Sequence, residues 1–490
     1  MAKKITRRGA CQRLLASAGC MAGAGVWTTR GTEQTLAAGP SAVNQRETER
    51  TPARGPLKAH PTNPRYFADG SGKAILLAGS HNWANLVDLG VTDPPAVFDF
   101  GKYLDFLTRH NHNFFRLWRW ELSKFTSEEG DRTITAYCSP HPWERTGPGV
   151  AFDGRPKFDL NTFDEAYFSR LRARVKAAGE RGIYVSVMLF EGWESQFLRT
   201  EGHPFRGQNN IQGIKGEASG DKKWIEINTL NQPEIRAIQE VYLRKVIDTV
   251  NDLDNVLYET CNEAGPYSTD WQYHMIEYVK SYEAGLPKQH PVGMTFQYQY
   301  GSNTTLFNSP ADWISPNPDS ATGDHNYRDN PPAGDGRKVI VSDTDHLWGV
   351  GGDSPWVWKS FLRGLNFLYM DPLNYTTFEP LPKNADEVRR NLGYARQYAQ
   401  RMDLANMTPQ PTLCSTGYCL AKAGAEYLAY QLEAGSVFTV ELQAGSYDVE
   451  WFDPGTGRTV AGDPSAGGRS ASFTSPFTGH SVLYLKRRPA

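Results

Sequence analysis

The alternation of short apolar runs with longer amphipathic segments between residues 62 and 405 limits the possible folds more than any other feature of the sequence. The apolar runs have the length and composition of strands and occupy residues 75–81, 113–120, 184–190, 256–263, 292–298, 313–318, 338–346 and 366–372. Segments with helical spacing lie between them, at 98–110, 163–182, 232–252, 270–284, 355–364 and 385–402. Strands that alternate with helices predict a parallel sheet covered by helices.

The strand-like runs are nearly continuous in apolar residues, as expected for strands with both faces buried. Eight such units close most naturally into a (β/α)8 TIM barrel, here over residues 61–407. A doubly wound open sheet is the alternative. It commonly carries a Gly-rich phosphate-binding turn after its first strand, and no such turn follows the run at 75–81.

The pattern changes after residue 408. Short alternating runs such as YLAYQL, VFTVEL and YDVEWF are separated there by Gly-rich and Pro-Gly turns. This pattern predicts a small antiparallel β-sandwich over residues 408–490. Its sequence contains no group of metal ligands or nucleophiles, so we expect the chemistry to lie in the barrel.

The first 38 residues have a basic start, a twin arginine at Arg7-Arg8 and then small apolar residues. This resembles a twin-arginine export signal and predicts a periplasmic or extracellular protein. The residues before Cys20 lack the usual aliphatic residue of a lipoprotein box, so we do not expect a lipid anchor there. Residues 39–60, rich in Gly, Ala, Pro, Thr and charge, predict a disordered linker.

The charge balance and the cysteines exclude several classes of function. Lys and Arg number 52 against 54 Asp and Glu, so the net charge of −2 favours neither nucleic acid nor an anionic membrane. No apolar run approaches the roughly 18 residues of a membrane-spanning helix. Without a CxxC or HExxH motif we expect neither a metal nor a cofactor. Cys414 and Cys419 flank a short turn and could form a disulfide in an oxidising compartment.

The ends of the predicted strands gather aromatic, acidic and other polar side chains. In a (β/α)8 barrel these ends form the active-site face. Any one of these side chains has an ordinary explanation as a packed or hydrogen-bonded residue, but together they favour a binding site. The candidates are His81, Trp83, Arg116, Trp118, Glu191, Trp193, Asn262, Glu263, Gln297, Tyr298, Asp343, Asp345, His346 and Trp348.

Carboxyl groups that face one another across such a mouth are the minimum for glycoside hydrolysis. Glu263 ends the fourth strand-like run, and KVIVSDTDH carries two aspartates at the end of the seventh. Strand alternation places Val339, Val341, Asp343 and Asp345 on one face. If the valines line the barrel interior, both aspartates point into the mouth. The 13 Trp and 23 Tyr residues leave rings that can stack on sugars.

Asn262-Glu263 at the end of the fourth strand resembles the Asn-Glu signature of clan A glycoside hydrolases, whose acid/base ends strand four and whose nucleophile ends strand seven. NPRYFADGSGKAILLAGSHNW resembles the start of cellulase-like and apiosidase-like members. NFFRLWRW resembles their second strand, which implies that Arg116 holds the nucleophile. The C-terminal part resembles a β domain that follows such barrels and is named for collagen binding, in the segments EYLAYQLEAGSVFTVELQAG and YDVEWFDPGTG. The resemblance covers about residues 62–486.

The resemblance implies a retaining hydrolase of the O-glycosyl bonds of a poly- or oligosaccharide. Glu263 is then the acid/base, and Asn262 donates to the sugar 2-hydroxyl. The clan's nucleophile is normally Glu, whereas strand seven here offers two aspartates. Alignment of VIVSD favours Asp343, with Asp345 as the alternative. The shorter Asp side chain could widen the gap between the carboxyl groups, so inversion also stays open.

Two other functions are alternatives to glycoside hydrolysis. The Glu-to-Asp departure motivates a non-catalytic carbohydrate-binding protein on a degenerate barrel. An esterase needs a nucleophile elbow such as GxSxG, and the sequence contains none. Release of reducing sugar from polysaccharides separates hydrolysis from binding alone, because a binder is retarded in affinity gels but releases nothing.

Overall fold

A computed structural model of the protein describes residues 51–129, 132–198, 200–216, 224–317, 326–371 and 382–489. The predicted export signal lies outside these residues. Residues 51–60, which the sequence assigned to a disordered linker, instead lie against the barrel. Ala53 N donates to Gly179 O at 2.8 Å, and β1 (Lys58–Ala59) pairs with β2 (Phe67–Ala68), which pairs in turn with β3 (Ala74–Ile75).

Eight parallel strands close into a barrel, because the last of them pairs with the first. In chain order they are β4 (Ala78–His81), β6 (Phe114–Leu117), β11 (Tyr184–Glu191), β12 (Val256–Asn262), β13 (Val292–Thr295), β14 (Trp313–Ser315), β15 (Val339–Asp343) and β16 (Asn366–Met370). Each overlaps one of the predicted strands. The prediction of a (β/α)8 TIM barrel is therefore confirmed, and the open sheet is excluded.

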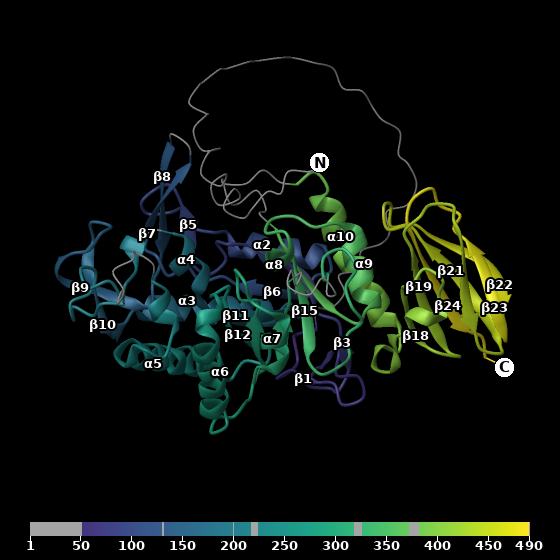
Figure 1. The fold of residues 1–490 in the computed structure, drawn as a ribbon, viewed down its shortest axis with the longest axis horizontal. Helices are drawn as coiled ribbons and strands as arrows, with labels where there is room; N and C mark the ends of the chain where they lie inside the picture. Colours follow the sequence, from purple (N-terminus) through teal and green to yellow (C-terminus); the bar gives the residue numbers. More distant parts are fainter. Residues whose placement is uncertain are drawn as a thin grey trace, which may run out of the picture.

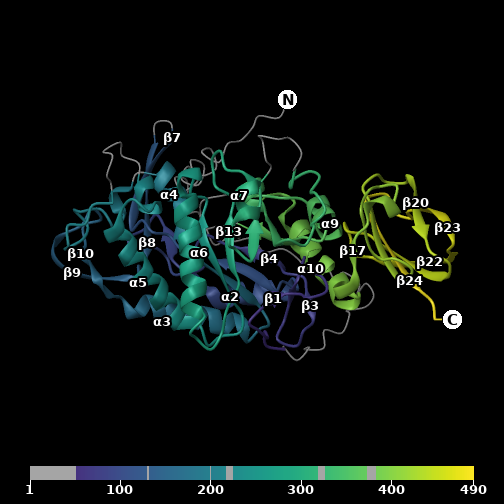
Figure 2. The same cartoon turned by 60° about the horizontal axis from the view of Figure 1, so that its bottom comes forward.

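Helices surround the barrel (Figures 1 and 2). The longer ones are α2 (Phe100–Arg109), α3 (Glu165–Gly179), α5 (Pro233–Val250), α6 (Thr269–Glu283), α9 (Ser354–Leu362) and α10 (Ala385–Arg401), and the short ones are α4 (Gly192–Phe197), α7 (Asn303–Asn308) and α8 (Thr344–Leu347). Asp99 and Asp164 cap the starts of α2 and α3 through their carboxylates. Among the helices of the described residues, none is long and apolar enough to cross a membrane.

The barrel strands separate two apolar layers. Inside lie residues such as Phe114, Leu257, Trp313, Val339 and Val341, which form a compact cluster. The opposite strand faces pack against the helices in a larger core. The two valines of β15 thus line the interior, which is the condition under which the sequence directs Asp343 into the mouth. Beyond this apolar cluster, towards the C-terminal ends of the strands, the barrel interior contains polar side chains such as Arg116 and Glu259.

Strands inserted after the first two barrel strands form one end of the molecule (Figures 1 and 2). β5 (Asp88–Gly90), β7 (Lys124–Glu129) and β8 (Arg132–Ser139) form a three-stranded sheet. β9 (Trp143–Val150) and β10 (Pro156–Phe163) form a hairpin.

The C-terminal strands form antiparallel sheets at the opposite end, beside α9 and α10 (Figure 1). One sheet has the order β17-β18-β19-β24-β21-β22, and β20 pairs with β23. Their bounds are β17 (Thr408–Pro409), β18 (Cys419–Lys422), β19 (Glu426–Gln431), β20 (Val437–Leu442), β21 (Ser446–Phe452), β22 (Thr459–Ala466), β23 (Arg469–Thr474) and β24 (Ser481–Arg487). The predicted β-sandwich is confirmed. Cys414 and Cys419 are free thiols here, so the structure does not contain the disulfide that the sequence allowed.

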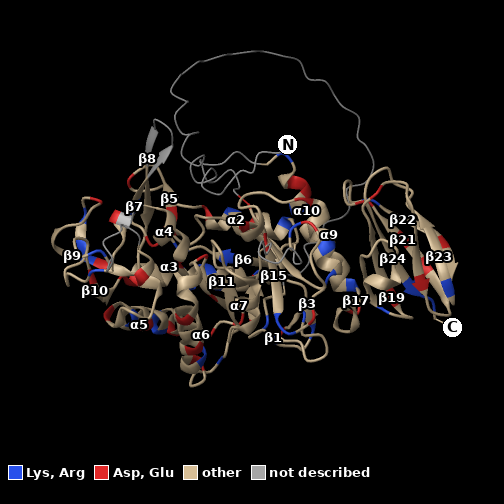
Figure 3. Ribbon diagram, in the orientation of Figure 1, with Lys and Arg blue, Asp and Glu red and all other residues tan. Residues whose placement is uncertain are grey.

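Aromatic packing joins this domain to the barrel. The ring of Phe452 lies 5.6 Å from that of Trp358 on α9 and 5.1 and 5.5 Å from those of Tyr394 and Tyr398 on α10. Acidic and basic residues are interspersed over both parts of the molecule (Figure 3), as the balanced composition predicts.

Candidate active site

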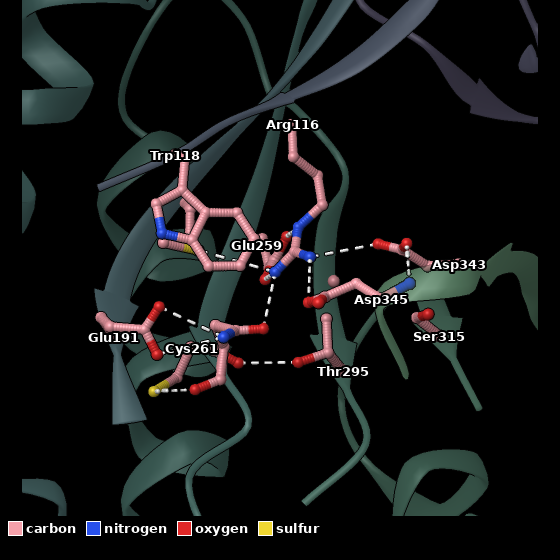
Figure 4. A network of polar contacts seen from close by, with 12 residues as sticks. Arg116, Trp118, Glu191, Glu259, Cys261, Thr295, Ser315, Asp343 and Asp345 are labelled. Atoms are coloured by element: carbon pink, nitrogen blue, oxygen red, sulfur yellow. Dashed lines mark hydrogen bonds and ion pairs between the residues drawn. The ribbon is translucent and has the colours of Figure 1, made fainter. Parts of the chain in front are cut away.

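Arg116 of β6 is the centre of the polar network inside the barrel (Figure 4). It is 1% exposed and donates twice to Glu259, from Nε to Oε2 at 2.7 Å and from Nη2 to Oε1 at 2.5 Å. Nη2 also donates to Asn262 Oδ1 at 2.8 Å. Nη1 lies 3.1 Å from both Asp343 Oδ2 and Asp345 Oδ2. One guanidinium thus contacts side chains of β12, of β15 and of the turn that follows β15.

Glu259 is the member of this network that the sequence analysis missed. It lies in the middle of β12 and is fully buried, on the same interior face as Leu257. Burial raises the pKa of Glu259, and the Arg116 guanidinium opposes the rise. An acid in the middle of an apolar strand, two residues from an interior leucine, was the signal that could have identified it.

Asp343 has both carboxylate oxygens occupied by donors. Oδ1 lies 3.2 Å from His81 Nε2 and accepts from Asp345 N at 2.8 Å, while Oδ2 accepts from Arg116. Burial by itself would raise the pKa of Asp343, but His81 and Arg116 hold it well below its usual range. Asp343 is therefore a carboxylate whose position is fixed by hydrogen bonds to both of its oxygens.

The alternation in KVIVSDTDH predicts Asp345 on the seventh strand, and this prediction is wrong. β15 ends at Asp343, and the helical turn α8 begins at Thr344. Asp343 caps this turn by accepting from the backbone N–H of Asp345, which stops the strand. The turn, rather than strand alternation, brings Asp345 to Arg116.

Glu263, Asp345 and His346 come together at the mouth. All three are buried, and an oxygen or nitrogen of each lies within 4.8 Å of those of the other two. Ser315 Oγ, at the end of β14, lies 2.7 Å from His346 Nδ1 and orients the ring. The spacing of the three side chains would also suffice to hold a metal ion, although the sequence predicted none.

The backbone of Glu263 has a φ of 51°, a left-handed conformation that is uncommon for a residue with a side chain. Gln196 supports it, because its Nε2 donates to Glu263 O at 2.7 Å and to Tyr298 O at 2.9 Å. Gly192 allows this close packing, since a Cβ at that position would lie 2.3 Å from Ala264 Cβ. Backbone strain of this kind costs about 1–3 kcal/mol and is found mainly at functional sites.

The aromatic candidates divide into two groups. Trp83 and Trp118 are 8% and 3% exposed; Trp118 stacks on His81 at 5.7 Å and lies 4.7 Å from the Arg116 guanidinium carbon. These two rings pack around the network. Trp193, Phe197 and Tyr298 instead form a partly exposed row, which we call the aromatic wall. Its successive ring centroids are 5.7 and 5.6 Å apart.

Two further candidates contact other parts of the chain. Gln297 Nε2 lies 3.1 Å from Thr269 Oγ1 and 3.3 Å from Gly265 O, so its amide supports the loop after β12. The Trp348 ring lies 4.8 Å from the Arg328 guanidinium carbon and 6.0 Å from the ring of Trp356. A sugar-binding role for either remains a prediction from the sequence.

Comparisons with known proteins agree with this fold. A protein described as "Glycoside hydrolase" superimposes with a TM-score of 0.57 at 11% sequence identity, over 88% of this chain and 97% of its own. A glycoside hydrolase family 5 from Bacteroides vulgatus ATCC 8482 superimposes with a TM-score of 0.55 at 12% identity, over 89% of this chain and 95% of its own. The chain has the fold of these proteins.

Sequence comparisons add less. Residues 129–299 match a family model described as "Domain of unknown function (DUF6298)". No curated protein matches the sequence significantly. The activity of the chain must therefore be inferred from the side chains at the mouth of the barrel.

Proposed function

We propose that the protein is a retaining glycoside hydrolase of poly- or oligosaccharides, with Glu263 as acid/base and Asp345 as nucleophile. The observation that carries this proposal is the approach of the Glu263 and Asp345 carboxyl groups to within 4.8 Å at the mouth. Carboxyl groups about 5–5.5 Å apart favour retention, whereas inversion needs about 6.5–9.5 Å to admit a water. The twin arginine at the N-terminus supports export as part of the same proposal.

The contacts of the two aspartates favour Asp345 as the nucleophile. Asp343 is held through both oxygens by His81, Arg116 and the backbone of α8, which suits a residue that positions its neighbours. The side chain of Asp345 is 7% exposed, against 2% for Asp343. A carboxylate oxygen of Asp345 also lies within 4.8 Å of one of Glu263. This assignment departs from the alignment, which favoured Asp343.

The geometry supports a two-step reaction. Glu263 donates its proton to the leaving oxygen while an Asp345 oxygen attacks the anomeric carbon and forms a glycosyl ester. Ester formation consumes the negative charge of Asp345. Glu263, now a carboxylate, then takes a proton from water as the water attacks the anomeric carbon and releases Asp345. Arg116 stabilises Asp345 as a carboxylate at the start and the end of this cycle.

Glu263→Gln is expected to lower kcat on a natural glycoside by about 10²- to 10⁴-fold, the usual contribution of general acid–base catalysis. The change keeps the shape of the side chain, so the thermal unfolding temperature should stay close to that of the wild type. Release of reducing sugar from a panel of polysaccharides measures the effect. Glu277→Gln makes the same chemical change at an exposed position of α6 and should leave turnover unchanged. Wild-type turnover in Glu263→Gln would contradict the assignment.

The aromatic wall is expected to bind sugar rings beside Glu263, since Gln196 ties the backbone of Glu263 to that of Tyr298. Trp193→Ala should raise KM for a polysaccharide by roughly 3- to 10-fold, because an aromatic contact contributes about 0.5–1.5 kcal/mol. Steady-state kinetics should show little change in kcat. Tyr300→Ala removes a ring that is 92% exposed and should leave KM unchanged. Equal effects of the two substitutions would count against the wall.

A non-catalytic carbohydrate-binding protein is the second candidate. The observation that favours it is the pairing of both Asp343 and Asp345 with Arg116, which ties up the negative charge that a nucleophile needs. Binding of a polysaccharide in an affinity gel, with no release of reducing sugar from any polymer tested, would favour this candidate over hydrolysis.

A further inference from the structure

Asn262 is held at both ends of its amide. Arg116 can only donate hydrogen bonds, so the amide atom 2.8 Å from Arg116 Nη2 is the oxygen. The nitrogen therefore faces Glu191, with Nδ2 at 3.0 Å from Oε1 and 3.2 Å from Oε2. Glu191 and Asn262 are also direct neighbours in register where β11 and β12 end. The chain itself thus fixes which way the amide points.

Glu191 is a buried carboxyl that lies at the start of α4. It is 2% exposed, and it forms no ion pair with the part of the chain that the structure describes. Its Oε1 accepts from Trp193 N at 2.9 Å, which caps α4, and its backbone N donates to Glu121 Oε1 at 2.8 Å. The side chain is therefore fixed against the start of α4, with Asn262 as its other polar contact.

Burial, with a smaller contribution from Glu194, favours the neutral form of Glu191. Burial raises the pKa of Glu191 well above its usual range, and Glu194 on α4 adds to the rise, while Asn262, Trp193 N and Arg116 oppose it. Burial raises the pKa of Glu194 as well, to about 8. Behind them, burial would raise the pKa of Glu121, but Arg119 and His203 lower it. The Cys261 thiol of β12 also faces the group, and burial raises its pKa.

A neutral carboxyl at this place still accepts a hydrogen bond from Asn262 Nδ2 through its carbonyl oxygen. An amide nitrogen carries two N–H groups. One N–H shared between the two Glu191 oxygens accounts for both contacts and leaves the second N–H for a ligand. Asn262 directly precedes Glu263, so a ligand hydroxyl that meets this N–H lies beside the bond that Glu263 protonates. In a glycoside that hydroxyl is the one on the carbon next to the anomeric carbon.

We propose that Glu191 is a positioning residue that determines, through Asn262, how strongly the site prefers a sugar with a 2-hydroxyl to its 2-deoxy analogue. The inference rests on the proposed function and extends it to a residue that does not touch the sugar but orients one that does. When the Glu191 carboxyl is lost, the Asn262 amide keeps its contact with Arg116 through its oxygen and turns about that contact. The 2-hydroxyl loses a correctly aimed donor, while a 2-deoxy substrate loses nothing.

The test compares kcat/KM for an aryl glycoside and its 2-deoxy analogue, built on the sugar that the polysaccharide screen releases. Glu191→Ala is expected to lower the ratio of the two values by up to about 10-fold, the scale of one hydrogen bond. Glu191→Gln keeps a carbonyl oxygen where Trp193 N and Asn262 both donate, and it should retain a ratio near that of the wild type. Glu277→Gln is the surface control and should leave the ratio unchanged.

A purely structural role of Glu191 would lower kcat/KM for both substrates alike and leave the ratio constant, which overturns the inference. If Glu191→Ala does not fold, the same ratio is measured on Glu191→Asp, whose carboxyl is withdrawn by one methylene. A smaller drop in the ratio is expected for this variant. A wild-type protein that hydrolyses neither substrate overturns the proposed function, whereas an active wild type with an unchanged ratio in the variants overturns only the role of Glu191.

Discussion

Asp345→Gly is expected to lower kcat on a natural glycoside by at least about 10⁴-fold, the scale on which removal of a covalent nucleophile acts. The reason is geometric. Asp345 is the aspartate that approaches Glu263, and the helical turn α8 places it there while Arg116 orients its carboxylate. Without it, Glu263 can still protonate the leaving oxygen, but no group of the chain attacks the anomeric carbon. Steady-state kinetics on the sugar found in the screen measures the loss.

Azide separates the nucleophile from a residue that merely supports it. In Asp345→Gly, azide can enter the space of the lost carboxylate and attack the anomeric carbon while Glu263 gives its proton to the leaving group. The expected product is a glycosyl azide with the anomeric configuration opposite to that of the substrate. Asp343→Gly removes a partner of His81 and Arg116, so its activity should also fall, but azide should not restore it. Rescue of the Asp343 variant alone would reverse the assignment.

Glu259→Ala is expected to lower the free energy of unfolding by about 3–5 kcal/mol. The substitution leaves Nε of Arg116 without its acceptor and removes one acceptor of Nη2, inside a barrel where water does not replace them. It also leaves a cavity in the polar layer. Urea denaturation, followed by tryptophan fluorescence, measures the change. Glu259→Gln keeps the volume of the side chain and one hydrogen-bond acceptor, so it should lower the free energy of unfolding by less.

A surface pair offers the matched control for this prediction. Arg172 also donates twice to a carboxylate, that of Asp252, but the two side chains are 43% and 60% exposed. Asp252→Ala should therefore cost at most about 1 kcal/mol. If Glu259→Ala and Asp252→Ala destabilise the protein equally, the buried pair does not stabilise the barrel as described.

The order of the strands could be predicted from the sequence because each strand is a local apolar run, and local runs determine where Asn262 and Glu263 fall. The resemblance implied a contact of Arg116 with the nucleophile, but its contacts with Glu259 and Asn262 could not be predicted, because only closure of the barrel brings strand four to this guanidinium. Glu259 is visible in the sequence as an acid inside an apolar strand, but the cation that explains it lies on another strand.

Two local predictions failed because a contact overrode the pattern. The alternation in KVIVSDTDH suggested a strand through Asp345, but the carboxylate of Asp343 caps the backbone N–H of Asp345 and starts a helical turn instead. The composition of residues 51–60 suggested a linker, but a backbone hydrogen bond to Gly179 and the pairing of β1 with β2 hold them on the barrel. Neither composition nor periodicity contains such contacts.

The most direct test of the account is to identify the residue that carries the sugar during the reaction. The wild-type protein is incubated with an activated 2-deoxy-2-fluoro glycoside of the sugar that it hydrolyses, digested, and its peptides are sequenced by mass spectrometry. The expected result is one covalently bound sugar per protein, on Asp345, and none in Asp345→Gly. A sugar on Asp343, or turnover with inversion and no labelled peptide, would contradict the assignment of Asp345 as the nucleophile.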